Sequence, residues 1–350
     1  MNNWQLIASS GEDYNAFASV IIDNNIYIRG YDNIYQLNIE AGGVIWSHLF
    51  KNQKPMATNA LIGNKEGVFT YEEHKNNKEY TTTFYWFSLS GEVLWKKTLP
   101  YVPYKNAISI TANNTLLMNG VSYGEDSIAI VELDIKTGEV VFHQNHSKLL
   151  EFTFFYENKR VFLGSDGCYL FKKEESDKLT LLSEDRITEI IINAKNHLFY
   201  ISEADEVDEY YLKQLDISSQ KLKILYTFEN PDTNLGPLIS SNQKFFYLPG
   251  GIDEGEGLQK INLETSKEVW SINNEDWTFY NIINLQDHIV ASIKDKTKPG
   301  KSFVIYIDKS SGKVLGKIDS MANPSDIYSL NNQSFLITGT YEVQLIRQAL

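Results

Sequence analysis

Residues 132–142 read ELDIKTGEVVF, a pattern that indicates a β-hairpin. The residues before the turn alternate between polar and apolar, which is typical of a half-buried β-strand. Thr137 and Gly138 predict a tight turn, because glycine adopts a positive φ at no steric cost. Val140, Val141 and Phe142 then begin a second strand. The stretch is therefore a β-hairpin, and the chain repeats it.

Six other stretches share this pattern of a polar residue, a short turn and a mostly apolar second strand. They are NIEAGGVIW ending at Trp46, SLSGEVLW ending at Trp95, KEESDKLTL ending at Leu181, DISSQKLKI ending at Ile224, NLETSKEVW ending at Trp270 and DKSSGKVLG ending at Gly316. With Phe142 included, successive ends lie 39 to 49 residues apart. A period of about 40 to 50 residues with four strands per unit is typical of β-propeller blades.

The two ends of the chain complete the pattern. After Gly316 come three predicted strands, SDIYSLNN, SFLITGT and YEVQLIRQAL, and no fourth. The missing strand is predicted at the N-terminus as NWQLIAS, where Trp4 takes the place of Trp46 or Trp95. Such a strand closes the ring without an open sheet edge. We predict one all-β domain over 1–350, an eight-bladed propeller of four-stranded antiparallel blades.

The predicted blades end near residues 50, 99, 146, 184, 229, 274 and 320, and the last comprises 321–350 with a strand from about 1–10. KEESDKLTL is the most degraded copy. If it were an insertion, seven blades would follow.

The string D-x-x-T-G-x-x-x-W/F, seen as DIKTGEVVF, resembles the repeat of the pyrroloquinoline-quinone-like, eight-bladed β-propeller superfamily. The resemblance spans essentially the whole chain. It implies a structural role for the blade anchors, namely Trp4, Trp46, Trp95, Phe142 and Trp270. The quinoprotein dehydrogenases of that superfamily carry an adjacent cysteine pair beside the quinone, whereas Cys168 is the single cysteine here. We therefore expect a non-enzymatic member without a cofactor, and quinone chemistry is the weakest alternative.

The charge of the chain indicates which class of partner to expect. The net charge is −13 and the pI about 5.0, which disfavours nucleic acid and anionic membranes and favours a basic protein partner. No apolar run approaches the roughly 18 residues that a membrane helix needs. The first residues lack a basic segment followed by an apolar one, so we expect a cytoplasmic protein. The oligomeric state is open, with a monomer favoured.

Catalytic and metal-binding motifs are weak in this sequence. His143 and His146 are three residues apart, a spacing that points two side chains of a strand to opposite faces. Residues 120–124, GVSYG, imitate a nucleophile motif but fall in a predicted hairpin, where the strand-to-helix turn of that motif cannot form. Cys168 is expected to be a buried small hydrophobe. We predict no catalytic residue and no metal site.

Acidic residues gather in two predicted loops between the second and third strands of consecutive blades. The loops contain Glu203, Asp205, Glu206, Asp208 and Glu209, and then Asp253, Glu254 and Glu256. They are expected to form one negative surface for a basic partner, with Tyr31, Tyr123 and Trp277 as aromatic anchors. Solvated hairpin tips are the structural alternative. Calcium in these loops is a lesser alternative, since the spacing does not match an EF-hand.

Two functions remain open at this stage. In the first, a non-catalytic ring binds a macromolecular partner, most concretely as an inhibitor or immunity-type protein that masks a basic toxin or effector. In the second, the central channel of the propeller holds a small ligand or a hydrolase or lyase centre. Residues of such a centre would come from different blades, so a single sequence does not reveal them.

Overall fold

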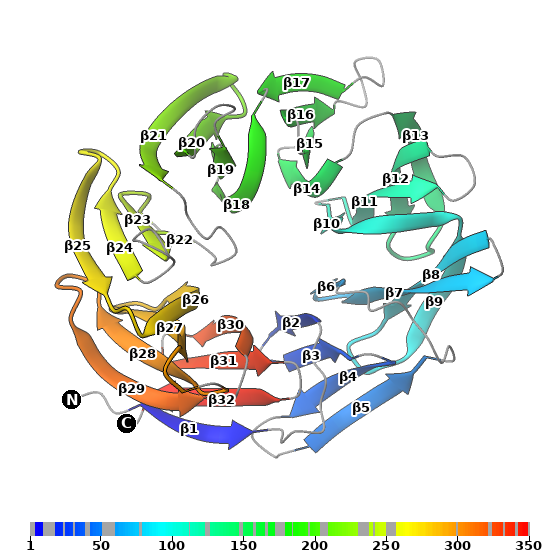
Figure 1. Ribbon diagram of the computed structural model, residues 1–350. Coiled ribbons are helices and arrows are strands. Elements are labelled where there is room, and N and C mark those ends of the chain that lie inside the picture. Colours follow the sequence, from blue (N-terminus) through cyan, green and yellow to red (C-terminus); the bar gives the residue numbers. More distant parts are fainter. Residues whose placement is uncertain are drawn as a thin grey trace. The chain divides into compact units, whose positions relative to one another are not determined.

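The computed structural model of the chain is built from β-strands. It describes residues 4–9, 18–23, 25–30, 32–38, 43–50, 60–76, 79–111, 113–122, 127–146, 150–156, 159–164, 167–171, 179–183, 185–194, 197–203, 209–229, 238–240, 242–249, 257–298, 300–320, 324–331, 333–339 and 342–348. All elements in these ranges are strands, β1 to β32 (Figure 1). The all-β prediction is therefore confirmed for the described part of the chain.

The chain divides into two compact units. One comprises residues 15–185 and is called the N-terminal unit, and the other comprises 186–350 together with 1–14 and is called the C-terminal unit.

The N-terminal unit contains two four-stranded sheets and one eight-stranded sheet. The first has the order β2 (Ala18–Ile22), β3 (Asn25–Arg29), β4 (Asn33–Asn38), β5 (Gly43–Leu49). The second is β6 (Leu61–Asn64), β7 (Gly67–Asn76), β8 (Glu79–Phe87), β9 (Val93–Leu99). The third joins β10 (Tyr101–Ile110), β11 (Thr115–Ser122), β12 (Ser127–Asp134), β13 (Val140–His146) to β14 (Leu150–Tyr156), β15 (Lys159–Gly164), β16 (Gly167–Phe171), β17 (Leu179–Ser183). A single parallel pair, Asn106 with Phe152, joins these two antiparallel meanders.

The C-terminal unit contains four four-stranded sheets. The first of three meanders is β18 (Arg186–Ala194), β19 (His197–Glu203), β20 (Glu209–Asp216), β21 (Lys221–Glu229). The second is β22 (Leu238–Ile239), β23 (Phe245–Pro249), β24 (Gly257–Asn262), β25 (Lys267–Asn273). The third is β26 (Trp277–Asn284), β27 (His288–Asp295), β28 (Ser302–Asp308), β29 (Val314–Ser320). The fourth has the order β1 (Trp4–Ser9), β32 (Val343–Gln348), β31 (Ser334–Gly339), β30 (Pro324–Asn331). Trp4 pairs with Gln348, so the first strand of the chain completes its last sheet.

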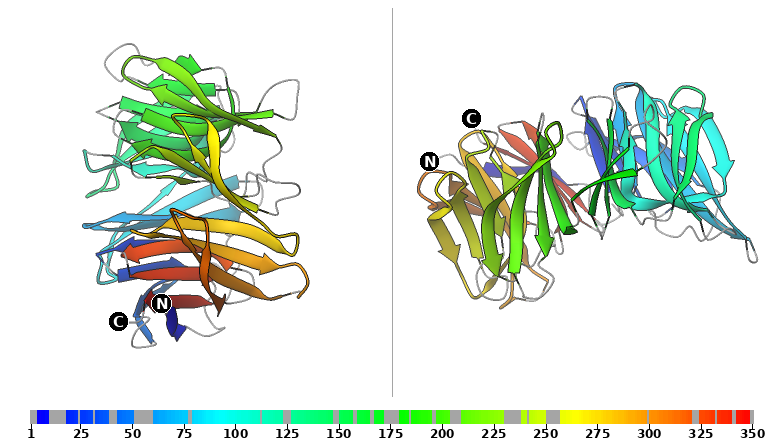
Figure 2. Two further views of the ribbon diagram at one scale, coloured as in Figure 1. Left: turned by 90° about the vertical axis from the view of Figure 1, so that its left-hand side faces the viewer. Right: turned by 90° about the horizontal axis from the view of Figure 1, so that it is seen from above.

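The middle strands whose side chains are described are largely buried, because neighbouring sheets in a unit pack face to face. In β28, for example, every residue except the last is buried. Such continuous apolar runs are typical of strands covered on both sides. The fourth strands differ, since β13 and β29 alternate between exposed and half-buried residues. Figure 2 shows the twist of these sheets from two further directions.

Three tryptophans on fourth strands join neighbouring sheets. The indole N–H of Trp46 donates to the Leu89 carbonyl at 3.0 Å, and that of Trp95 donates to the Ile135 carbonyl at 2.7 Å. Both contacts lie in the N-terminal unit. In the C-terminal unit the Trp270 indole donates to the Lys309 carbonyl at 3.1 Å. Each acceptor lies in or beside the third-to-fourth strand turn of the following sheet.

A glycine of that turn lies under each ring. A Cβ at Gly91, Gly138 or Gly312 would come within 2.5, 2.8 and 2.7 Å of the ring atoms of the facing tryptophan. All three glycines have positive φ, which side chains disfavour. The repeated hairpin is therefore a docking platform for an aromatic ring. Phe142 is a variant of this arrangement, since its half-buried side chain packs against a cluster that includes Leu150 and Tyr169.

A buried group of charged and polar side chains lies between the first two sheets of the N-terminal unit. Arg29 is fully buried, and its Nη1 donates to the Asn33 carbonyl at 2.9 Å. Its guanidinium carbon lies 4.1 Å from the centre of the Phe50 ring. Burial lowers the pKa of Arg29 to about 10, and the negative charge of Glu72 opposes this shift.

Glu72 is the acidic member of this group and is also buried. Its Oε2 accepts a hydrogen bond from the Tyr85 hydroxyl at 2.5 Å. Burial raises the pKa of Tyr85, and the hydrogen bond to Glu72 adds to the effect. The Tyr85–Glu72 hydrogen bond joins β8 to β7, and Arg29 of β3 interacts with Glu72 through its charge. Neither Arg29 nor Glu72 has exposed surface that a substrate could reach.

Replacing Gly312 tests the docking platform. Ala at positive φ costs about 1–2 kcal/mol at Gly312 and at Gly300 alike, because both have left-handed backbones. Only at Gly312 does the new methyl group also collide with Trp270, and overpacking of this kind costs roughly 1–3 kcal/mol. We expect Gly312→Ala to lower the free energy of unfolding by that extra amount relative to Gly300→Ala. Equal losses in denaturant unfolding would show that the ring does not need the glycine.

Removing Arg29 tests the buried charges. Arg29→Met removes the hydrogen bonds that Nη1 donates to the Gly30 and Asn33 carbonyls and the positive charge that acts on buried Glu72, and leaving buried acceptors unpaired costs about 1–3 kcal/mol. Adding Glu72→Gln removes the isolated charge and keeps an acceptor for Tyr85. We expect the double variant to be more stable than Arg29→Met alone. Additive losses in thermal unfolding would contradict the coupling.

Candidate functional site

Both acidic segments occupy the expected connections between second and third strands. The first connects β19, which ends at Glu203, to β20, which begins at Glu209. The second connects β23, which ends at Pro249, to β24, which begins at Gly257. Glu203 and Glu209 are half-buried, and the Glu209 carboxylate accepts a hydrogen bond from the Tyr211 hydroxyl at 3.0 Å. The described edges of the first loop are thus partly engaged in their own sheet.

Most of the predicted partner-binding residues lie outside the described residues. These are Asp205, Glu206, Asp208, Asp253, Glu254, Glu256, Tyr31 and Tyr123. Their role remains a sequence-based prediction.

Trp277 is described, and it lies in β26. It is half-buried, with its ring centre 5.3 Å from that of Phe303 in an edge-to-face arrangement and 6.3 Å from that of Phe279. The indole therefore contributes to packing within its own sheet, and only part of it is accessible to a partner.

The side chains with catalytic potential have structural surroundings. Nε2 of His146 is hydrogen-bonded to the Asn119 side chain at 2.8 Å, and burial lowers the pKa of His146 to about 4. His143 is exposed, because its side chain points to the face of β13 opposite to that of His146. Cys168 is buried and its thiol pKa is raised by burial, so the reactive thiolate is disfavoured.

A cavity of about 300 Å³ lies in the C-terminal unit, between the β22–β25 and β26–β29 sheets. Phe245 and Tyr247 of β23 and Lys260 of β24 come from the first sheet. Asn284, at the end of β26, and Lys309, in the β28–β29 turn, come from the second. The cavity therefore lies at the end of the sheets that carries the first-to-second and third-to-fourth strand turns. The acidic connections belong to the opposite end, because antiparallel neighbours reverse direction at each turn.

Two lysines give the cavity its charge. Nζ of Lys260 donates to the Lys309 carbonyl at 2.5 Å and lies 4.1 Å from the centre of the Phe245 ring. Nζ of Lys309 donates to the carbonyls of Leu285 and, at 2.7 Å, Gln286. Burial lowers the pKa of both lysines. For Lys309 the positive charge of Lys260 acts in the same direction.

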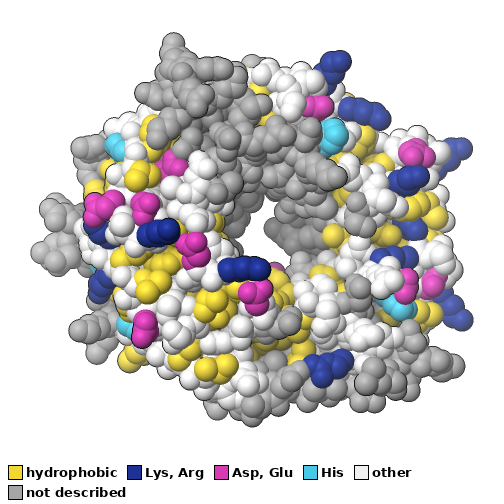
Figure 3. Space-filling view, turned by 180° about the vertical axis from the view of Figure 1, so that it is seen from behind, with side chains coloured by type: hydrophobic (Ala, Val, Ile, Leu, Met, Phe, Trp, Pro, Cys, Tyr) yellow, Lys and Arg dark blue, Asp and Glu magenta, His cyan; other side chains and the backbone are white. Residues whose placement is uncertain are grey.

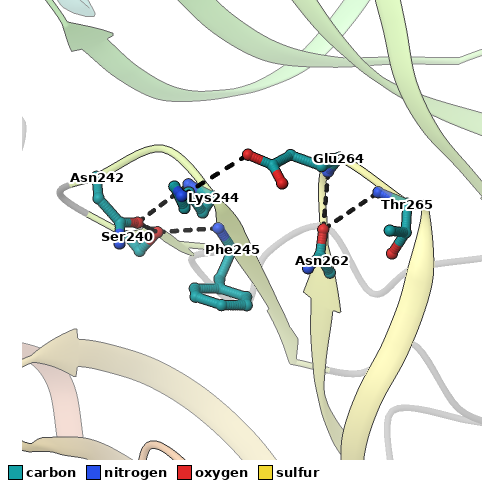
Figure 4. A network of polar contacts seen from close by, with 7 residues as sticks. All are labelled: Ser240, Asn242, Lys244, Phe245, Asn262, Glu264 and Thr265. Atoms are coloured by element: carbon teal, nitrogen blue, oxygen red, sulfur yellow. Dashed lines mark hydrogen bonds and ion pairs between the residues drawn. The ribbon is translucent and has the colours of Figure 1, made fainter.

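The rim of the cavity is held by hydrogen bonds within turns (Figure 4). The Ser240 hydroxyl donates to Asn242 Oδ1 at 2.7 Å and accepts from the Phe245 backbone N–H at 2.9 Å. Outside the cavity, Nζ of Lys244 lies 3.8 Å from a carboxylate oxygen of Glu264, and both side chains are exposed. These contacts fix the turn from which Phe245 enters β23.

Sequence reasoning did not identify Lys260, Lys309 or Asn284. The aligned repeats do share one feature at this position, a buried polar residue on the third strand opposite the anchor. Gln36 pairs with Trp46, Glu132 with Phe142 and Lys260 with Trp270. Gln36 and Glu132 bond inside their own sheets, to Asn25 and Thr115. Lys260 instead reaches the neighbouring sheet, and only the packing of the two sheets reveals this.

Surface charge is mixed on the face shown in Figure 3, where basic and acidic side chains of described residues are interspersed. Among the described residues, no group of three or more His, Cys, Asp and Glu side chains is arranged to hold a metal ion. The described part of the chain also contains no helix of the length and apolarity needed to cross a bilayer.

No protein-family model matches the sequence, and no curated protein matches it either. Solved structures do match. The computationally designed Ika8 protein aligns with a TM-score of 0.68 at 13% identity, over 99% of this chain and 100% of its own. BamB from Moraxella catarrhalis, which has a PQQ-like β-propeller fold, aligns with a TM-score of 0.64 at 10% identity, over 99% of this chain and 100% of its own.

At such low identity these likenesses show the fold alone. They confirm the β-propeller fold expected from the repeats. Structural matches extend to 1116 solved chains, so the fold is common and by itself selects no function.

Proposed function

We propose that this chain is a non-catalytic binding protein, an eight-bladed propeller closed by its first strand, whose loop face docks a basic macromolecular partner. The most concrete version is an inhibitor or immunity-type protein that masks a basic toxin or effector. The blade count is supported by the repetition of four-stranded antiparallel meanders in each unit. The pairing of β1 with β32 supports closure by the N-terminal strand.

The placement of the acidic segments carries the docking proposal. They occupy the same connection, second to third strand, in consecutive sheets of one unit, and β18 packs against β22 between those sheets. We expect loops at equivalent ends of packed sheets to be neighbours, so that their charges add. Together with the net charge of −13, this favours fast association with a cationic partner.

Charge reversal tests this function. A partner is first captured from native lysate at low salt, identified and purified. Its affinity is then measured for the wild-type protein and for Asp205→Lys with Asp253→Lys. We expect binding at least tenfold weaker for the variant, with a smaller salt dependence, because the attraction between opposite charges is lost.

The matched control is Glu264→Lys with Asp287→Lys, which changes the net charge equally. Glu264 and Asp287 are exposed and lie in turns at the opposite end of the sheets. The control variant should retain most of the affinity. A partner that binds the Asp205 and Asp253 variant as tightly as wild type would exclude the acidic loops as the site.

A further inference from the structure

We propose that the cavity between the β22–β25 and β26–β29 sheets binds a carboxylate that carries a neighbouring N–H donor, as in an N-acyl amino acid or a peptide C-terminus. This site lies at the opposite end of the sheets from the acidic loops, so it goes beyond the proposed function and does not depend on it. The inference rests on three features of the cavity: two lysine ammonium groups, a hydrogen-bond acceptor without a partner, and an aromatic wall.

The cations provide the attraction. Among the described residues, neither Lys260 nor Lys309 has a carboxylate within ion-pair distance, although Asp308 and Asp287 are close enough to influence them. Oδ1 of Asp308 already accepts hydrogen bonds from the N–H and hydroxyl groups of Ser310 and of its neighbour in the turn, which hold this carboxylate in the turn. Lys260 is buried and Lys309 is half-buried. Two ammonium groups at least partly removed from water and without a direct counter-ion are costly, and an anion between them offsets that cost.

The lysines retain donors for a ligand. An ammonium group has three N–H bonds. Lys260 uses one on the Lys309 carbonyl, and Lys309 uses two, on Leu285 and Gln286. Two donors on Lys260 and one on Lys309 are therefore left, which suits the two acceptor oxygens of a carboxylate.

Asn284 adds the second recognition element. Its Oδ1 is buried and has no hydrogen-bond partner among the described residues. Leaving a buried acceptor unpaired is costly. A carboxylate has no proton to offer at neutral pH, so the ligand needs an N–H beside the acid group. This requirement distinguishes an amide-linked acid from a simple inorganic anion.

An aromatic wall completes the site. Phe245 and Tyr247 both line the cavity, and the Lys260 ammonium already lies against the Phe245 ring. A volume of about 300 Å³ is at the small end of ligand pockets. The site therefore has room for about one residue, with an apolar side chain against the rings and the acid group between the lysines.

The test uses N-acetyl-leucine as the probe and N-acetyl-leucine amide as its uncharged match, with binding followed by calorimetry and by NMR shifts. We expect the acid to bind at least tenfold more tightly than the amide. Asn284→Asp keeps the shape of the site but introduces a negative charge, and Lys260→Met removes a cation. Each should weaken binding of the acid at least tenfold. Lys244→Met, at an exposed lysine outside the cavity, should leave it unchanged.

Several results would overturn the proposal: no binding of the acid at millimolar concentration, equal binding of acid and amide, or unchanged binding in a folded Asn284→Asp protein. An N-acetylated tetrapeptide ending in leucine separates the two sources of the ligand. Tighter binding of the tetrapeptide indicates a protein terminus, and weaker binding indicates a free acid. The Asp205→Lys and Asp253→Lys protein should bind the probe as wild type does, so the two proposals fail independently.

Discussion

The contact on which the structure depends is an indole ring lying over a glycine turn of the next sheet, with its N–H donating to a backbone carbonyl. It occurs at Trp46, Trp95 and Trp270. The ring occupies the space where a Cβ would be, so the turn needs glycine. The positive φ at this position also favours glycine over residues with a side chain. One short hairpin therefore holds its own sheet together and provides the surface to which the preceding sheet attaches.

Packing sheet against sheet in this way buries the middle strands on both faces, and it decides what happens to polar side chains there. Arg29 and Glu72 are fully enclosed between two sheets of the N-terminal unit. Lys260 is placed differently, because it lies near the end of its strand and shares the Lys309 carbonyl with Trp270. The docking contact that joins these sheets thus also forms a wall of the cavity.

The ends of the sheets in the C-terminal unit differ in chemistry. The second-to-third strand connections carry the acidic sequence segments, whereas the opposite end holds a cavity with Lys260 and Lys309. Antiparallel meanders place these features apart in every repeat. A protein with a net charge of −13 would in this way offer the proposed acidic surface and still keep the proposed local site for an anion. The two proposed binding sites therefore lie at opposite ends of the same sheets.

The sequence by itself determined the strand content, the hairpin repeat and the pairing of the first strand with the last sheet. These follow from local periodicity, from glycine at the turns and from the missing fourth strand after Gly316. It also placed the acidic segments on equivalent connections. Only the tertiary structure decided that Trp277 packs on Phe303 and that Lys260 meets Lys309, 49 residues away. Those contacts join different strands and sheets, and nothing in the period of a single strand specifies which side chains will meet across the packed faces.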